Sequence, residues 1–168
     1  MSRRAHVLVV LTLLALALTV VGAPGARALP TEVWAGCGQS SPPEKVVRVF
    51  PRATFVPGPL GASSALLCGT ETYGYRHVAA RHGPDWQNIA LYTGENWRDL
   101  TDFAVEQILR APQPGYPRYN DKNDTWAFKS PLEIRDGEGH VRETYYPFVV
   151  VAGGDGKIIT AYPTRDPA

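Results

Sequence analysis

One short segment of the chain combines two imidazole groups with two guanidinium groups. Residues 75–83 read YRHVAARHG and contain Arg76, His77, Arg81 and His82. An imidazole titrates near neutral pH and can therefore take up or release a proton, while a guanidinium group can bind a phosphate. These residue types suit acid–base catalysis on a phosphodiester, a reaction that such groups can carry out without a metal ion.

A second segment, near the C-terminal end, offers two hydroxyl groups. Residues 156–163 read GKIITAYP, which is typical of a strand that follows a glycine turn. Thr160 and Tyr162 are two residues apart, so a strand would direct both hydroxyls to one face. The alternative is an ordinary solvent-facing strand, in which Thr and Tyr are common. If the fold brings the two segments together, one site would hold imidazole, guanidinium, hydroxyl and phenol groups.

The spacing of the two histidines argues against a metal centre. His77 and His82 are five residues apart, which separates them by about 140° around a regular helix. The H-E-x-x-H pattern of zinc proteases is absent as well. We therefore expect no metal site and no cofactor.

The two histidines are expected to differ in role. His82 lies at the end of the predicted helix, where the helix dipole favours an imidazolium, so a packed capping residue is the alternative to a catalytic one. His77 lies one helical turn from Arg81 on the more polar row, which favours acid–base chemistry for His77. Lys129 could supply charge to a phosphate, the alternative being an ordinary solvated lysine.

The elements that must position these residues follow from hydrophobic periodicity. The pattern predicts a helix over residues 73–82, which Gly83-Pro84 should end, and a second helix over residues 95–109. Strands are predicted at 46–50, 126–128, 132–134, 141–152 and 157–162, with glycine-rich hairpin turns at 136–139 and 153–156. This order predicts an α+β fold, with N-terminal helices packed on a four-stranded antiparallel sheet.

The N-terminus has the three parts of a secretory signal peptide. Arg3 and Arg4 precede an apolar run over residues 7–21, and Ala26-Arg27-Ala28 resembles a cleavage site. A membrane anchor is the alternative, but a spanning helix needs about 20 apolar residues, and this run is shorter. We expect cleavage after residue 28, a secreted extracellular protein and no stable membrane association afterwards.

Cleavage would change the charge of the protein. Removing Arg3, Arg4 and Arg27 from the 17 Lys and Arg leaves 14 against 16 Asp and Glu, a net charge of −2. A non-specific nucleic-acid coat needs a basic surface that displaces counterions, so the composition argues against that class. A local basic pocket remains compatible with this charge.

Both cysteines lie in the expected mature chain. A pair of cysteines in an exported protein predicts one disulfide, here Cys37–Cys68. Residues 29–67 are rich in Pro, Gly and Ser and are expected to form an irregular N-terminal extension that this bond ties down. Residues 68–168 are expected to form the compact domain.

The helix motif and the late GKIITAYP strand together resemble a known fold. A helix reading R-H-x-x-x-R-H, a second helix and an antiparallel meander ending in T-x-Y-P look like the small metal-independent RNase fold. Barnase-like, EndoU-like, colicin-type tRNase and RelE-like toxins share that fold. The chain is most similar to bacterial EndoU-like toxin nuclease domains, over about residues 68–163.

The resemblance implies an activity and roles for particular residues. His77 and His82 would be the acid–base pair, and Thr160 and Tyr162 would bind phosphate or orient the 2′-hydroxyl. Arg76, Arg81 and Lys129 would bind the substrate. The implied partner is RNA, with tRNA as one candidate, together with a cognate immunity protein. The alternative is a secreted non-enzymatic binding or inhibitor module on the same fold.

Overall fold

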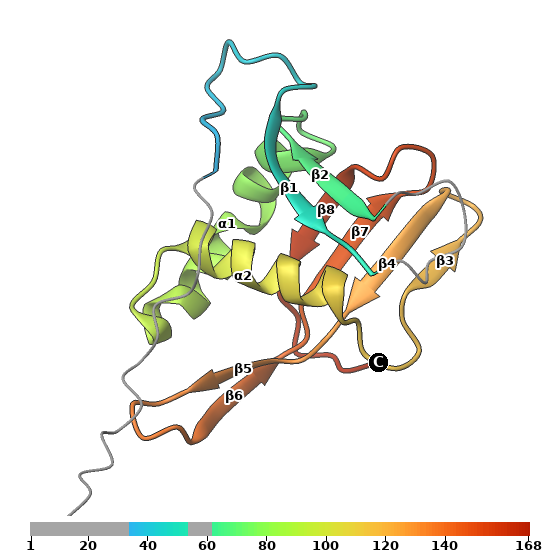
Figure 1. Cartoon of the computed structure of the whole chain (residues 1–168). Helices are drawn as coiled ribbons and strands as arrows, with labels where there is room; N and C mark the ends of the chain where they lie inside the picture. The colour runs from blue at the N-terminus through green and yellow to red at the C-terminus, as the bar shows by residue number, and fades with distance from the viewer. Residues whose placement is uncertain (1–33, 54–61) are drawn as a thin grey trace, which may run out of the picture.

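The computed structural model describes residues 34–53 and 62–168, so the expected signal peptide, residues 1–28, lies outside the described residues. The elements follow in the order β1 (Val46–Pro51), β2 (Ser63–Leu67), α1 (Gly74–Thr93), α2 (Trp97–Arg110), β3 (Arg118–Asn120), β4 (Thr125–Lys129), β5 (Leu132–Arg135), β6 (Val141–Tyr145), β7 (Phe148–Ala152) and β8 (Ile158–Tyr162). The protein is α+β, as its sequence predicts (Figure 1). No helix within the described ranges is both long and apolar enough to cross a membrane.

The largest sheet has four antiparallel strands in the order β3-β4-β7-β8. Helix α2 and the β1–β2 hairpin pass in front of this sheet in Figure 1. Phe128, Val149 and Ala161 pair across three of its strands and are buried in the core. Because side chains alternate along a strand, Lys129, Phe148 and Tyr162 point to the opposite side, which we call the outer face.

The predicted layout of helices and strands was wrong in two respects. The β1–β2 hairpin precedes the helices, so the helices are not N-terminal in the described chain. In addition, β5 and β6 form a separate two-stranded sheet, inserted between β4 and β7. The predicted strand over residues 141–152 is broken near Pro147, because proline has no N–H to donate to a strand ladder.

The first helix is longer than the sequence predicts. We expected Gly83-Pro84 to end it, but α1 continues to Thr93 and ends at Gly94 in the left-handed conformation, with φ of 74°. Beyond Pro84, α1 buries Trp86, Ile89 and Ala90 in the core. Burial of a large aromatic side chain stabilises a fold by several kcal/mol, which is enough to offset the roughly 3 kcal/mol cost of a proline within a helix.

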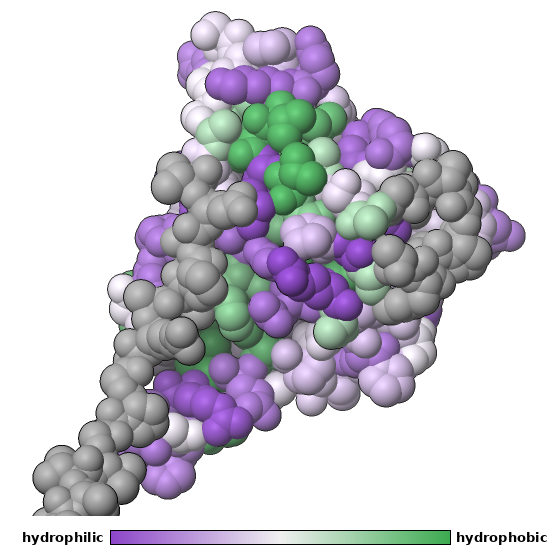
Figure 2. All heavy atoms as spheres, in the orientation of Figure 1, coloured by the Kyte–Doolittle hydropathy of each residue, from purple (hydrophilic) through white to green (hydrophobic). Residues whose placement is uncertain are grey.

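The predicted strand near residue 46 is confirmed, and it belongs to the hydrophobic core. Val47, Phe50 and Leu66 of the β1–β2 hairpin are buried in that core. The segment that we expected to be an irregular extension therefore contains structure that supports the rest of the fold. On its other side the hairpin is less covered: Val46 and Val49 are about half exposed, and Figure 2 shows apolar side chains gathered over this part of β1.

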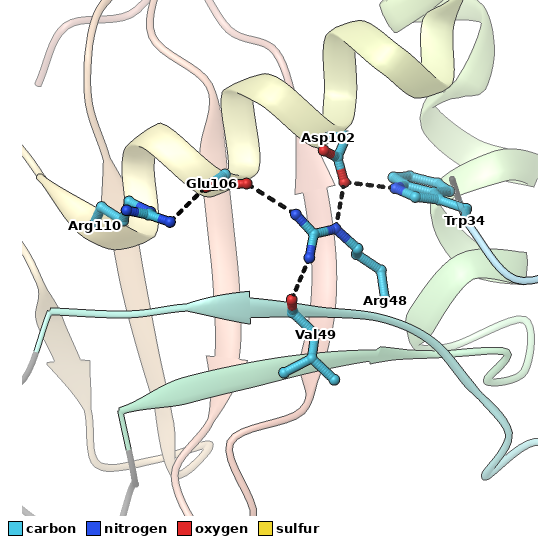
Figure 3. Close-up of polar contacts among 6 residues, drawn as sticks. All are labelled: Trp34, Arg48, Val49, Asp102, Glu106 and Arg110. Carbon is cyan, nitrogen blue, oxygen red and sulfur yellow. Dashed lines mark hydrogen bonds and ion pairs between the residues drawn. The ribbon is translucent and has the colours of Figure 1, made fainter. Parts of the chain in front are cut away.

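A buried ion-pair network joins this hairpin to α2 (Figure 3). The Arg48 guanidinium donates hydrogen bonds of 2.9 Å to both Asp102 and Glu106. The Trp34 indole N–H also donates to Asp102, at 2.7 Å. The side chains of Arg48 and Asp102 are only 6% and 1% exposed. Charges this deeply buried destabilise a fold unless each is paired, so the network fixes where β1 lies against α2.

The predicted disulfide between Cys37 and Cys68 is confirmed. It links residues separated by 31 positions and leads directly into α1, because Cys68 lies just before that helix. Loop-closure entropy predicts that a bond of this span stabilises the folded state by about 3–4 kcal/mol.

Reduction of this bond is expected to lower the melting temperature by about 10 °C, given about 3 °C per kcal/mol for a domain of this size. Thermal circular dichroism with and without reductant measures this shift. The intact mass should be about 2 Da below that of the reduced protein, one hydrogen being lost from each of the two cysteines when the bond forms. Two reactive thiols in the untreated protein would contradict the assignment.

Candidate active site

The two predicted site segments lie side by side. Helix α1 packs along β8, one of the two edge strands of the four-stranded sheet. The Trp86 indole N–H donates to the backbone carbonyl of Ala161 at 3.1 Å. An edge strand leaves backbone groups unpaired, and this bond satisfies one of them while holding the helix against β8. The arrangement brings the first half of α1 beside the end of β8.

Three rings meet at this junction. The His82 ring lies 5.0 Å from the Tyr162 ring, and the His77 ring lies 5.5 Å from the His82 ring, measured between centroids. All three side chains are partly exposed. The two histidines thus lie together despite their separation around the helix. Two imidazoles and a phenol from segments about 80 residues apart in the sequence form one cluster.

The hydrogen bond of His77 fixes its tautomer. Its Nδ1 lies 2.8 Å from the backbone carbonyl of Glu71. A carbonyl oxygen only accepts hydrogen bonds, so Nδ1 must carry a proton. The other nitrogen, Nε2, is then the atom at which His77 can gain or release a proton.

His82 lies in a different electrostatic environment. Partial burial lowers its pKa below the ordinary value of 6.5, and the neighbouring His77 and Arg81 act in the same direction, whereas Asp85 opposes them. The Asp85 carboxylate is 3.6 Å from Nδ1 of His82 and favours a proton on that nitrogen. His82 is therefore neutral at pH 7, with Nε2 free to accept a proton.

The alternative role of His82 as a helix cap does not hold. That reading required the helix to end at Gly83, whereas α1 continues to Thr93. The dipole effect is confined to the last turn of a helix, so it does not act on a residue in the middle of α1.

Tyr162 is kept protonated by its surroundings. Burial raises the pKa of its phenol, and the neighbouring Tyr116 raises it further. The phenol is therefore a hydrogen-bond donor at neutral pH. Thr160 pairs with Val150 on the same outer face, and its hydroxyl oxygen is buried without a hydrogen-bond partner in the described part of the chain.

The two predicted arginines have different surroundings. The Arg76 guanidinium donates to the backbone carbonyls of Gly69, Gly38 and Ser41, at 2.8, 2.8 and 2.6 Å. Arg76 therefore ties the disulfide-bonded segment to α1, and these bonds occupy its guanidinium. Arg81 is exposed, and its charge acts on His82. Of the two, Arg81 is the one whose charge acts on the ring cluster.

Lys129 lies on the outer face but is 2% exposed. It pairs with Phe148 across the sheet, and Phe148 pairs with Tyr162, so the three side chains form one row. The Lys129 ammonium donates to the carbonyl of Ala168 and lies 4.0 Å from the Asp166 carboxylate. The last residues of the chain thus cover this cation, which is not the solvated lysine considered as the alternative.

Sequence reasoning missed two aromatic neighbours of this cluster. The Phe148 ring lies 5.5 Å from that of Tyr162, and the Tyr116 ring lies 6.2 Å from that of Phe148. The period-2 pattern of the predicted strand could have placed Phe148 on the Val150 side of the sheet. Tyr116 lies in a loop before β3, and no periodicity in the sequence indicates its position.

Metal-ligand residues gather elsewhere in the described chain. Asp136, Glu138 and His140 lie close together on the turn between β5 and β6, where Glu138 and His140 are exposed. Arg142 already forms an ion pair with Asp136 at 2.8 Å. Exposed acidic groups on a turn commonly have no ion, and this cluster includes none of the predicted site residues.

Comparison with known proteins identifies related sequences, but it assigns no activity to them. No family model matches the chain, and no solved structure matches it. Two curated proteins from two strains of Mycobacterium tuberculosis are each 38% identical over 140 residues, which covers 79% of this chain and 50% of each relative. The chain spans about half the length of these relatives. Both are described as uncharacterized proteins.

Proposed function

We propose that this protein is a metal-independent endoribonuclease. The observation that carries the proposal is the meeting of His77, His82 and Tyr162 at the junction of α1 and β8. The different environments of the three groups supply a neutral base, a second imidazole and a protonated phenol within one cluster. Pairs of titratable groups with unlike environments are typical of acid–base catalysis.

In this proposal the reaction is an in-line transfer at phosphorus. Neutral His82 takes the proton of a ribose 2′-hydroxyl through Nε2, and the 2′-oxygen attacks the adjacent phosphorus. The bond from phosphorus to the 5′-oxygen breaks, and this leaving oxygen receives a proton from Nε2 of His77, which enters the reaction protonated on both ring nitrogens. The products are a 2′,3′-cyclic phosphate and a 5′-hydroxyl. Tyr162 and Arg81 donate hydrogen bonds to the developing phosphorane oxygens, a contribution that is commonly the largest in such catalysis.

Export and protection belong to the same proposal. The disulfide and the apolar N-terminal segment support a secreted protein, since disulfides persist in oxidising compartments. An active ribonuclease endangers the cell that makes it, so the proposal includes a cognate immunity protein that covers the histidines. Transfer RNA is one candidate for the RNA substrate.

The test is incubation of the oxidised protein, residues 29–168, with total RNA in the presence of EDTA. Cleavage that persists without divalent ions supports the proposal. RNA that stays intact at high protein excess would contradict it and would favour a non-enzymatic binding module.

The lowered pKa of His82 predicts how kcat/KM for RNA cleavage changes at acidic pH. A general base works only when neutral, so kcat/KM should fall as the pH drops through the pKa of His82. Since burial lowers this pKa, the inflection should lie below 6.5. The rate of cleavage of a fluorogenic RNA between pH 4.5 and 8 measures it. An inflection above 6.5 would contradict the assignment of His82 as the base.

A further inference from the structure

The ring cluster continues past the histidines along the sheet. Beyond Tyr162, the Phe148 ring follows at 5.5 Å and the Tyr116 ring at a further 6.2 Å. With the two imidazoles at the other end, five rings form one uninterrupted row. All five side chains are partly exposed, so a molecule bound at the imidazoles could extend along the row.

Small apolar side chains lie beside this row on the outer face. Ala127 and Val150 pair between Arg118 on β3 and Thr160 on β8. Both are half-buried and carry no charge or hydrogen-bonding group. Their small apolar side chains next to the aromatic rings suit contact with a planar group.

A cation lies at the far end of the row. The Arg118 guanidinium sits over the Tyr116 ring, 4.4 Å from its centroid, and its Nε donates to the carbonyl of Gly115 at 3.1 Å. Arg118 is exposed, in contrast to the covered Lys129. An exposed guanidinium held in place over an aromatic ring is a suitable partner for a phosphate.

We infer that Tyr116 and Phe148 form a stacking site for a nucleobase next to the cleaved phosphate, and that the substrate is single-stranded RNA. The inference rests on the proposed ribonuclease function. Base faces in a duplex are stacked on one another and cannot reach a protein ring, whereas unpaired bases stack readily on aromatic side chains. The Arg118 guanidinium binds the phosphate on the far side of that base.

The test separates binding from cleavage. A fluorescent single-stranded RNA with 2′-O-methyl groups cannot be cleaved by attack of its 2′-oxygen, so its affinity is measured by anisotropy at fixed salt. Phe148→Ala is expected to weaken binding about 5- to 100-fold, the range found for loss of one stacked base. Phe148→Tyr keeps the ring and should retain wild-type affinity within about 3-fold. Tyr92→Ala removes an aromatic ring that is 73% exposed on α1, outside the row, and should change nothing.

Each outcome decides between the two claims. Three results would overturn the stacking site. The first is that Phe148→Ala binds the single strand as tightly as the wild type does, and the second is that the wild type does not bind it. The third is that the wild type binds a 2′-O-methylated duplex as tightly as the single strand. If Phe148→Ala proves unstable by thermal denaturation, Tyr116→Ala and Tyr116→Phe provide the same comparison. Binding that needs Phe148 without cleavage of unmodified RNA would overturn the catalytic proposal alone. Normal cleavage with an unchanged KM in Phe148→Ala would overturn the stacking site alone.

Discussion

Replacement of His82 by alanine is expected to lower the rate of RNA cleavage by at least about 100-fold. The substitution removes the only imidazole that contacts both the His77 and Tyr162 rings in the described chain. Loss of a general base typically costs 10²- to 10⁴-fold in rate. His77→Ala is expected to have an effect of similar size, since it removes the proposed acid. Initial rates on a fluorogenic RNA at pH 7 measure both.

The control is His140→Ala. This histidine is exposed on the turn between β5 and β6 and belongs to no part of the ring cluster. Its variant should cleave RNA at the wild-type rate. Melting temperatures of all three variants should stay close to that of the wild type, because the replaced side chains are partly exposed. Wild-type cleavage by a well-folded His82→Ala or His77→Ala protein would remove that residue from the mechanism.

Replacement of Asp102 by alanine is expected to destabilise the protein by about 3–5 kcal/mol. The substitution leaves the Arg48 guanidinium buried without one of its two carboxylate partners, each 2.9 Å away, and takes the acceptor from the Trp34 indole. At about 3 °C per kcal/mol, the melting temperature should fall by about 10–15 °C. Thermal circular dichroism measures the shift.

Arg110→Ala is the matched control, because Arg110 pairs with the same Glu106 but is 55% exposed. Exposed ion pairs contribute little, so this variant should change the free energy of unfolding by less than about 1 kcal/mol. In the double variant Arg48→Met/Asp102→Leu both buried charges are gone, and much of the lost stability should return. Equal losses for Asp102→Ala and Arg110→Ala would contradict the account of the network.

Some elements of this fold follow directly from local sequence. The glycine-rich turns at 136–139 and 153–156 connect hairpins as predicted, because glycine supplies the positive φ that such turns require. The side-by-side placement of Thr160 and Tyr162 on one face follows from strand periodicity. Cys37 and Cys68 pair because they are the only cysteines in the chain.

Other features depend on contacts between distant segments, which a local pattern does not contain. Gly83 and Pro84 are strong stop signals, yet burial of Trp86 against β8 keeps α1 helical. Arg48 and Asp102 are residue types that usually lie at the surface, and they are 54 positions apart in the sequence. No local sequence pattern therefore indicated that they would form a buried ion pair. Within the site, the sequence predicted the histidines and Tyr162, whereas Arg76 turned out to hold backbone carbonyls and Tyr116 went unrecognised.

The most direct test of the proposed chemistry is the identity of the ends that the protein leaves on a short RNA. Mass spectrometry of a defined oligonucleotide, incubated with the oxidised protein in EDTA, distinguishes the possibilities. The account predicts a 2′,3′-cyclic phosphate on one fragment and a 5′-hydroxyl on the other, with both products formed at least about 100-fold more slowly by His82→Ala. Fragments with a 5′-phosphate and a 3′-hydroxyl, or an uncleaved oligonucleotide, would contradict it.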